Sequence, residues 1–216
     1  MAGDTYNYFT IDDQHTGFYL LDVSGHGVTS ALLSASLSKQ LLPVNGSPLK
    51  IFKNEAPFYE IIPPAQVVAN LNTTFLQKDY CEQYFTMIYG LYNKSTHQIK
   101  FCQAAHPSPL HIHKNGIHIV GDGGFPVGLV PDTEYKELAI TLEVNDRLIL
   151  YSDGITECKN TLDEQFGEER FIELINSYKY VELKQLLFKI QEHLKEWHGD
   201  LKFKDDISIV TFERQF

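Results

Sequence analysis

The sequence has little of what disulfide-stabilised, zinc-binding or membrane-spanning proteins need. Its three cysteines, Cys81, Cys102 and Cys158, are odd in number and show neither C-x-x-C spacing nor histidines at zinc-finger intervals. We therefore expect reduced, packed thiols rather than a disulfide framework or a structural zinc site. No apolar stretch has the length of a membrane span, and the first residues lack the basic and apolar regions of a signal peptide. We expect a cytoplasmic protein.

Positive charge is also scarce. The chain has 18 Lys and Arg against 28 Asp and Glu, which gives a formal net charge of -10. This balance argues against nucleic acid or an anionic membrane as the partner. A hydrophobic content of 43% and the lack of low-complexity tracts indicate a globular fold, and 216 residues predict one domain. Part of the acidity is then available as metal ligands.

Aspartates stand at the ends of three apolar stretches. Asp22 lies near the end of the stretch LLDV, which is followed by a turn bracketed by Gly25 and Gly27. Asp153 follows LILYS and precedes another glycine, and the pair Asp205–Asp206 precedes ISIVTF. Carboxylates at strand ends, beside glycines that let the backbone come close, offer oxygen ligands to a hard cation. We hypothesise that these aspartates converge on one metal site.

Hydrophobic periodicity places strands and helices in separate blocks. Strands are predicted at 5–10, 17–23, 85–92, 98–103, 110–113, 117–120, 138–142, 147–152 and 206–213, and helices at 28–42, 64–78, 168–178 and 181–197. The stretch 43–63 is predicted to be a long loop or a short irregular helix, and a polar loop is expected after Asp153. This order predicts an α+β fold in which helices cover antiparallel sheets, rather than a doubly wound parallel sheet.

Seven motifs follow one another in an order that is itself informative. They are Ala2 to Asp4, Asp22 to Gly27, Phe85 to Gly90, Ala104 to Pro109, Tyr151 to Glu157, Phe166–Gly167 and Asp205 to Ser208. The series resembles the bacterial branch of the PPM (protein phosphatase 2C-like) serine/threonine phosphatases, typified by the SpoIIE and RsbU regulators. The resemblance runs from Gly3 to Phe212, which is essentially the whole chain.

This resemblance implies a sandwich of two antiparallel β-sheets flanked by helices, with two manganese or magnesium ions at one edge. Asp22 corresponds to the carboxylate that bridges both ions, and Val23 to a residue whose backbone carbonyl binds one of them. Asp153 and Asp205 would supply further carboxylates, and Asp4 would be a ligand directly or through water. Asp22, Asp153 and Asp205 are thus the predicted catalytic residues, and no organic cofactor is expected.

The chemistry that these ligands imply is hydrolysis of a phosphate monoester. Two divalent ions about 3.5–4 Å apart acidify a bridging water and neutralise the transferring phosphoryl group. Resemblance to this branch suggests phosphoserine or phosphothreonine on a regulatory protein, an anti-sigma-factor antagonist in a partner-switching pathway. Two alternatives stay open: a catalytically silent module that sequesters such a partner, and a metal phosphodiesterase, for which no base-binding signature is found. A homodimer also stays open.

The sequence departs from the family pattern in three places. Ala105 replaces the usual glycine before His-Pro, and Asn7 stands where many members have an aspartate, so Asn7 is not predicted as a ligand. The segment that normally precedes Gly3 is expected to be missing, and with it an initial strand and a sensor or receiver domain.

Several histidines and one aspartate receive modest roles. His26 lies four residues after Asp22, whereas eukaryotic relatives carry the histidine two residues after their aspartate, so loop ordering is favoured over general acid catalysis. His106 is expected to order its proline loop, and Asp206 to support or cap rather than to bind metal. His111 and His113 alternate along a strand and could chelate zinc, but without a third ligand they are predicted to be exposed.

Overall fold

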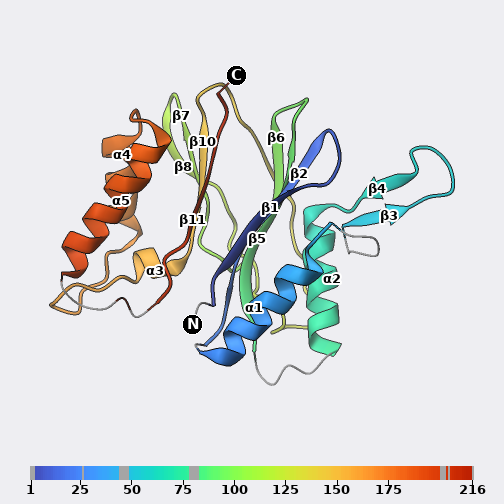
Figure 1. The fold of residues 1–216 in the computed structure, drawn as a ribbon, viewed down its shortest axis with the longest axis horizontal. Coiled ribbons are helices and arrows are strands. Elements are labelled where there is room, and N and C mark those ends of the chain that lie inside the picture. The colour runs from blue at the N-terminus through green and yellow to red at the C-terminus, as the bar shows by residue number, and fades with distance from the viewer. Residues whose placement is uncertain are drawn as a thin grey trace. The chain divides into compact units, whose positions relative to one another are not determined.

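Two compact units make up the fold, and each draws on two parts of the chain. The computed structural model describes residues 3–25, 27–43, 49–77, 83–199, 203 and 205–215. The first unit comprises Met1–Ser108 and Gly121–Leu142, and the second comprises Pro109–Val120 and Glu143–Phe216. Figure 1 shows the fold with most of its helices and strands labelled.

The first unit is built on a five-stranded antiparallel sheet in the order β1-β2-β5-β6-β9. Its strands are β1 (Thr5–Thr10), β2 (His15–Val23), β5 (Phe85–Asn93), β6 (Gln98–Ala104) and β9 (Leu138–Thr141). The strands β2 and β5 are long and rich in aromatic and β-branched residues, which favour β-sheets, and all nine residues of β2 pair with β5. The predicted hairpins at 5–23 and 85–103 are confirmed.

Two helices, α1 (Val28–Gln40) and α2 (Pro64–Gln77), pack against this sheet. The apolar residues Leu33, Leu37, Val67, Leu71 and Phe75 of these helices form one core cluster with Tyr19, Leu21 and Val23 of β2. Since successive side chains of a strand alternate between faces, Asp22 points to the face of the sheet that α1 and α2 do not cover.

The prediction of a loop or irregular helix for 43–63 was wrong. The structure has a hairpin of two three-residue strands, β3 (Lys50–Phe52) and β4 (Tyr59–Ile61), while residues 44–48 lie outside the described part of the chain. Long-range contacts with the β1–β2 connection hold this hairpin: Tyr59 donates a hydrogen bond to Asp12 Oδ2 at 2.7 Å, and Lys50 Nζ donates to the Ile11 carbonyl oxygen at 2.5 Å. Strands this short leave too few alternations for a period of two to appear.

The second unit has a four-stranded antiparallel sheet in the order β11-β10-β7-β8. Its strands are β7 (Leu110–His113), β8 (Gly116–Ile119), β10 (Arg147–Tyr151) and β11 (Ile209–Glu213), and its helices are α3 (Asp153–Thr156), α4 (Glu168–Tyr178) and α5 (Leu183–His198). Apolar residues of α4 and α5 share a core cluster with Ile149 and Tyr151 of β10. Antiparallel sheets flanked by helices confirm the predicted α+β class.

Some predicted boundaries differ from the observed ones. The strand predicted from Asp206 begins at Ile209, and the polar loop predicted after Asp153 starts with the short helix α3. The consecutive strands β9 and β10 belong to different sheets. No described helix has both the length and the apolar character to cross a membrane.

The two described cysteines, Cys102 and Cys158, are buried free thiols, as predicted. Burial raises the pKa of Cys102 to about 12, so this thiol is protonated at neutral pH. Cys81 lies outside the described residues.

Candidate metal-binding residues

Gly3, Asp22 and Val23 come together at the end of β2 in the first unit. The ladder pairs Thr5 of β1 with Leu21 of β2, which brings the residues just before β1 alongside the end of β2. A Cβ atom on Gly3 would lie 3.0 Å from Asp22 Oδ1 and 3.0 Å from the Val23 carbonyl oxygen. One carboxylate oxygen and one carbonyl oxygen therefore face the same small space, and only a glycine leaves that space open.

The backbone of Gly3 is fixed by helix α1. Ser34, which is buried, donates a hydrogen bond from its hydroxyl to the Gly3 carbonyl oxygen at 2.5 Å. Asp4, the next residue, is half-buried, as is Asp22. The early Gly-Asp motif and the strand-end aspartate thus lie beside each other, as the hypothesis of converging carboxylates requires for this unit.

The glycine-bracketed turn after Val23 is tied to Tyr84, the residue that precedes β5. Ser24 N donates to the Tyr84 carbonyl oxygen at 2.9 Å, and Tyr84 N donates back to Ser24 Oγ at 3.0 Å. Gly25 and Gly27 have φ angles of 87° and 100°, a region that residues with a Cβ rarely adopt. His26 lies outside the described residues, so its loop-ordering role stays a prediction.

Replacing Gly3 with alanine tests whether these two oxygens bind metal. The added methyl group would crowd Asp22 Oδ1 and the Val23 carbonyl oxygen, so we expect Gly3→Ala to weaken divalent-metal affinity about tenfold, while thermal stability changes little because both oxygens need to shift by only a few tenths of an ångström. Calorimetric titration with Mn²⁺ measures the affinity. An unchanged affinity would show that this space is not used by a metal ion.

Thr86 is a residue of the site that sequence analysis did not single out. It lies directly opposite Asp22 in the β2–β5 ladder, so both side chains are on the same face of the sheet. Its hydroxyl is hydrogen-bonded to Nδ1 of the buried His106 at 2.8 Å. Gln103 holds the same loop by donating to the His106 carbonyl oxygen at 2.6 Å. His106 therefore orders its loop, as predicted, and also fixes the neighbour of Asp22.

Ala105, the departure from the family glycine, has a φ of 53°. Its backbone N donates to the Gly123 carbonyl oxygen at 2.6 Å, which holds the residue in this left-handed conformation. A non-glycine residue in this conformation lowers the stability of the fold by about 1–2 kcal/mol. Glycine loses more backbone freedom than alanine on folding, which offsets part of that difference. We expect Ala105→Gly to raise the free energy of unfolding by about 0.5–1 kcal/mol, measured by urea denaturation. A free energy of unfolding below that of the wild type would contradict backbone strain at Ala105.

In the second unit, Ser152 and Gly154 hold the stretch that contains the C-terminal aspartates. Ser152 N donates to the Ser208 carbonyl oxygen, and Ser208 N donates to Ser152 Oγ, both at 3.0 Å. The backbone of Gly154 lies even closer to this stretch, because a Cβ atom on Gly154 would be 1.9 Å from the Asp206 carbonyl oxygen. These contacts explain why β11 begins later than predicted: residues 206–208 are engaged with the β10–α3 junction.

The predicted ligands of this unit differ in exposure. Asp153, the first residue of α3, is half-buried, whereas Asp205 is exposed and accepts a hydrogen bond on Oδ1 from Asp206 N at 2.8 Å. Asp206, predicted as a supporting residue, is half-buried. Over the described ranges, no three His, Cys, Asp or Glu side chains form a group spaced to hold a metal ion, so the full ligand set stays a prediction.

A histidine cluster lies elsewhere in the second unit, on β7 and β8. The ring centroids of His111 and His113 are 5.1 Å apart, and those of His113 and His118 are 4.4 Å apart. His111 is half-buried, with Nε2 3.0 Å from Asp146 Oδ2, and His113 is half-buried as well, so the prediction that both are exposed was wrong. Sequence analysis missed His118 because only the β7–β8 register places it opposite His111.

The donor set of each unit suits a hard divalent cation. Carboxylates and a backbone carbonyl are the ligands that Mg²⁺ and Mn²⁺ prefer, and the spaces beside Gly3 and Gly154 bring such groups close to the backbone. Neither the Gly3–Asp22–Val23 group nor the Ser152–Asp206 group contains the thiolate ligands that softer metals favour.

Solved structures with the same fold define the class. The SiaA-PP2C domain of Pseudomonas aeruginosa superposes with a TM-score of 0.78 at 18% identity, over 98% of this chain and 80% of that one. A structure titled RsbX in complex with magnesium gives a TM-score of 0.64 at 17% identity, over 98% and 86% of the two chains. The chain therefore has the fold of PP2C-type phosphatase domains.

A family model then identifies the chain more closely. The model described as stage II sporulation protein E (SpoIIE) matches residues 12–215, so the chain belongs to that family, and the match spans both units. Among curated proteins, phosphoserine phosphatase RsbU of Bacillus subtilis is 27% identical over 100% of this chain. The chain spans 60% of the length of that relative. The predicted family resemblance is confirmed.

Proposed function

We propose that this chain is a metal-dependent protein phosphatase that hydrolyses phosphoserine or phosphothreonine. The observation that supports this most directly is the pair of close approaches at Gly3 and Gly154, each beside an aspartate motif of the family. At each of these glycines the missing side chain makes room for a carbonyl or carboxylate oxygen, the kind of atom that binds a hard divalent cation. Membership of the SpoIIE family and the name of the RsbU relative support the same activity.

The proposed metal ligands are the carboxylates of Asp4, Asp22, Asp153 and Asp205 and the carbonyl oxygen of Val23. Bound divalent ions would supply an acidified water as the nucleophile and positive charge for the phosphoryl oxygens. We propose two ions, manganese or magnesium; a related structure is titled as a magnesium complex. The rigid backbone around these residues fixes the donors, since Ser34 holds Gly3 and Ser152 holds the Asp206 stretch.

The proposed substrate is a phosphorylated regulatory protein of the anti-sigma-factor antagonist type, within a partner-switching pathway. The support is the family and the RsbU relative, which is named a phosphoserine phosphatase. We also propose that the two units act together as a single phosphatase domain, since one family model matches both.

Phosphate release from a phosphoserine protein tests the proposal. The assay compares Mn²⁺, Mg²⁺ and Ca²⁺ with a chelated sample, and uses a phosphorylated anti-sigma-factor antagonist beside a phosphotyrosine peptide. We expect release only with Mn²⁺ or Mg²⁺ and only from phosphoserine or phosphothreonine. Binding of the phosphorylated protein without any metal-dependent release would instead favour the silent module that sequesters its partner.

A further inference from the structure

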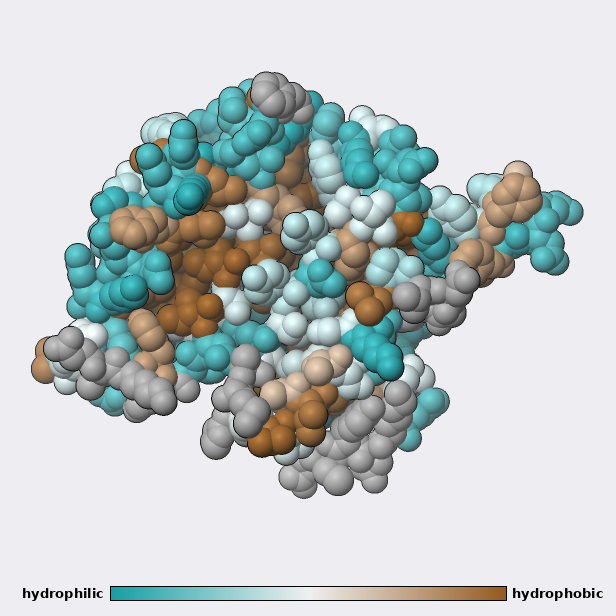
Figure 2. Space-filling view, viewed as in Figure 1, coloured by the Kyte–Doolittle hydropathy of each residue, from teal (hydrophilic) through white to brown (hydrophobic). Residues whose placement is uncertain are grey.

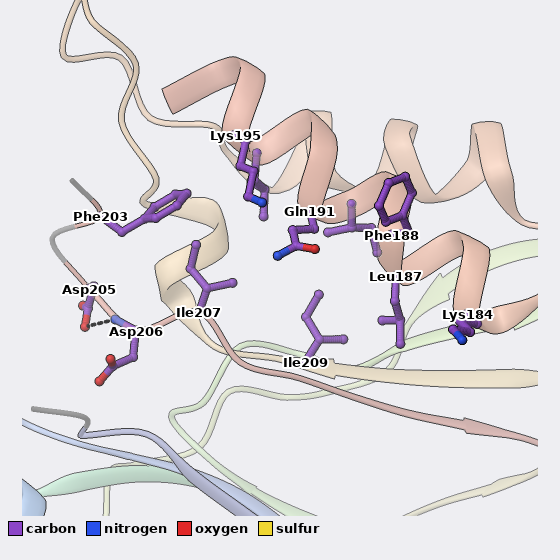
Figure 3. A pocket seen from close by; sticks show the side chains of 12 residues that line it. Lys184, Leu187, Phe188, Gln191, Lys195, Phe203, Asp205, Asp206, Ile207 and Ile209 are labelled. Carbon is purple, nitrogen blue, oxygen red and sulfur yellow. Dashed lines mark hydrogen bonds between the residues drawn. The ribbon is translucent and has the colours of Figure 1, made fainter. Parts of the chain in front are cut away.

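The two faces of the second unit's sheet carry different side chains. Leu110 and Ile112 of β7 share a core cluster with residues of α4 and α5. On this face, hydrophobic side chains gather over α5 and β11 (Figure 2). They line a groove of about 580 Å³ that has Asp205 and Asp206 at one end (Figure 3). Because successive residues of a strand alternate between faces, the neighbours of Leu110 and Ile112 in β7 point to the other face of the sheet.

Three histidines lie together on that other face. His111 and His113 are two residues apart on β7, and the ladder places His118 of β8 directly opposite His111. The ring centroids of His111 and His113 are 5.1 Å apart, and those of His113 and His118 are 4.4 Å apart. Two imidazoles bound tetrahedrally to one zinc ion have ring centroids about 5 Å apart, since each Zn–N bond is about 2.0–2.1 Å long. The separations of these rings are therefore close to those that one shared ion requires.

Asp146 prepares His111 to act as a ligand. The Asp146 carboxylate is buried, and its Oδ2 lies 3.0 Å from His111 Nε2. The same oxygen accepts a hydrogen bond from Glu143 N at 2.9 Å, which fixes the carboxylate in place. Because a carboxylate only accepts hydrogen bonds, His111 donates from Nε2 and keeps the lone pair on Nδ1 for a metal ion. Histidines that bind metal ions in proteins commonly donate their other ring N–H to such a carboxylate.

The other two imidazole rings can turn to meet the same ion. No three His, Cys, Asp or Glu side chains in the described part of the chain are spaced for a metal ion as they stand, so binding requires ring rotation. His118 is exposed, and exposed side chains change rotamer within nanoseconds. His113 Nδ1 accepts only a long hydrogen bond, 3.3 Å from Asn115 N, which a bond to zinc would replace. Neither rotation breaks a contact of the core.

We propose that His111, His113 and His118 bind one zinc ion, with water in the fourth position, and that this ion fastens β8 to β7. β8 is the last strand in the order β11-β10-β7-β8, and among the described strands it pairs with β7 alone. Imidazole nitrogens suit zinc, whereas Mn²⁺ and Mg²⁺ favour the carboxylates proposed as ligands above. The histidine site is thus chemically distinct from the site proposed for phosphate hydrolysis and does not depend on that activity.

Zinc titration in excess Mg²⁺ tests the proposal. The Mg²⁺ competes for carboxylate sites, and a fluorescent zinc indicator reports the free zinc. We expect one zinc ion to bind per chain. His118→Gln should weaken its affinity at least about tenfold, because the change removes one of three ligands at an exposed position where glutamine is tolerated. The matched control is His193→Gln on α5, also in the second unit, which should bind zinc as the wild type does.

A ligand replacement identifies the binding residue directly. Co²⁺ takes the place of zinc in tetrahedral sites, and a thiolate bound to Co²⁺ absorbs strongly in the near ultraviolet. The Co²⁺ complex of His118→Cys, kept reduced, should show this absorption. The wild-type complex should lack it, since both described cysteines are buried free thiols.

Four results would overturn the proposal. They are no zinc binding in excess Mg²⁺, equal weakening by His118→Gln and His193→Gln, no thiolate absorption from His118→Cys, and a dimer that forms only with zinc. The last result, seen by sedimentation, would mean that two copies of the chain share the ion. None of these measurements uses phosphate release, so they remain decisive if the proposed function fails.

Discussion

Asp22→Asn is expected to lower metal-dependent phosphate release by on the order of a thousandfold. The substitution keeps the shape of the side chain beside Gly3 but removes the negative charge proposed to hold the ions. Metal ions contribute several kcal/mol to transition-state stabilisation in such reactions, and each 1.36 kcal/mol corresponds to a factor of ten in rate. Asp153→Asn, on the second unit, should have an effect of similar order. Initial rates of phosphate release across a Mn²⁺ titration measure both.

The matched control is the same change at an exposed aspartate, Asp13→Asn, in the turn between β1 and β2. It should leave both the rate and the half-saturating Mn²⁺ concentration unaltered. Thermal unfolding should show that Asp22→Asn is folded, because an asparagine relieves rather than adds charge repulsion. If Asp22→Asn kept its rate within tenfold of wild type with the same Mn²⁺ dependence, Asp22 would not be a metal ligand.

Most of the fold could be predicted because its elements are long enough to show a period. The helices α2 and α4 and the pairing of β2 with β1 follow from apolar residues at helical or alternating spacing. The hairpin of β3 and β4 could not be predicted, since three residues give no period and its support comes from Asp12, 47 residues before its partner Tyr59. The division of β9 and β10 between sheets is likewise a matter of long-range pairing.

The residues of the candidate site were predicted from the order of the motifs, but the residues that hold them in place were not. Asp22 and Gly3 are visible in the sequence as strand-end and Gly-Asp motifs, but nothing local indicates that Gly3 faces the Asp22 carboxylate. Thr86 became recognisable only through the β2–β5 register, which sets it opposite Asp22. Ser152 lies within a motif, yet its role depends on a partner, Ser208, 56 residues later. Residues that position other residues through long-range contacts show no characteristic spacing in the sequence.

Gly154→Ala is expected to have the largest effect on stability and metal binding together. A methyl group there would lie 1.9 Å from the Asp206 carbonyl oxygen, so the backbone around Asp205 and Asp206 must move by about 1 Å to reach a normal contact. That movement breaks the hydrogen bonds between Ser152 and Ser208. We expect a loss of about 2–3 kcal/mol of stability, a melting temperature lower by roughly 5–10 °C, and activity reduced about a hundredfold.

Gly90→Ala separates the two effects, because it also introduces a clash but belongs to the first unit, whereas the C-terminal aspartates belong to the second. Its Cβ atom would lie 2.3 Å from the ring of buried Phe18 in the first unit. We expect a similar fall in melting temperature, with Mn²⁺ affinity and rate kept near wild type at temperatures where the variant is folded. Calorimetric Mn²⁺ titration of both variants decides the matter. Equal losses of metal affinity would mean that Gly154 acts only through general stability, and a loss confined to Gly154→Ala would mean that it positions the aspartates that follow.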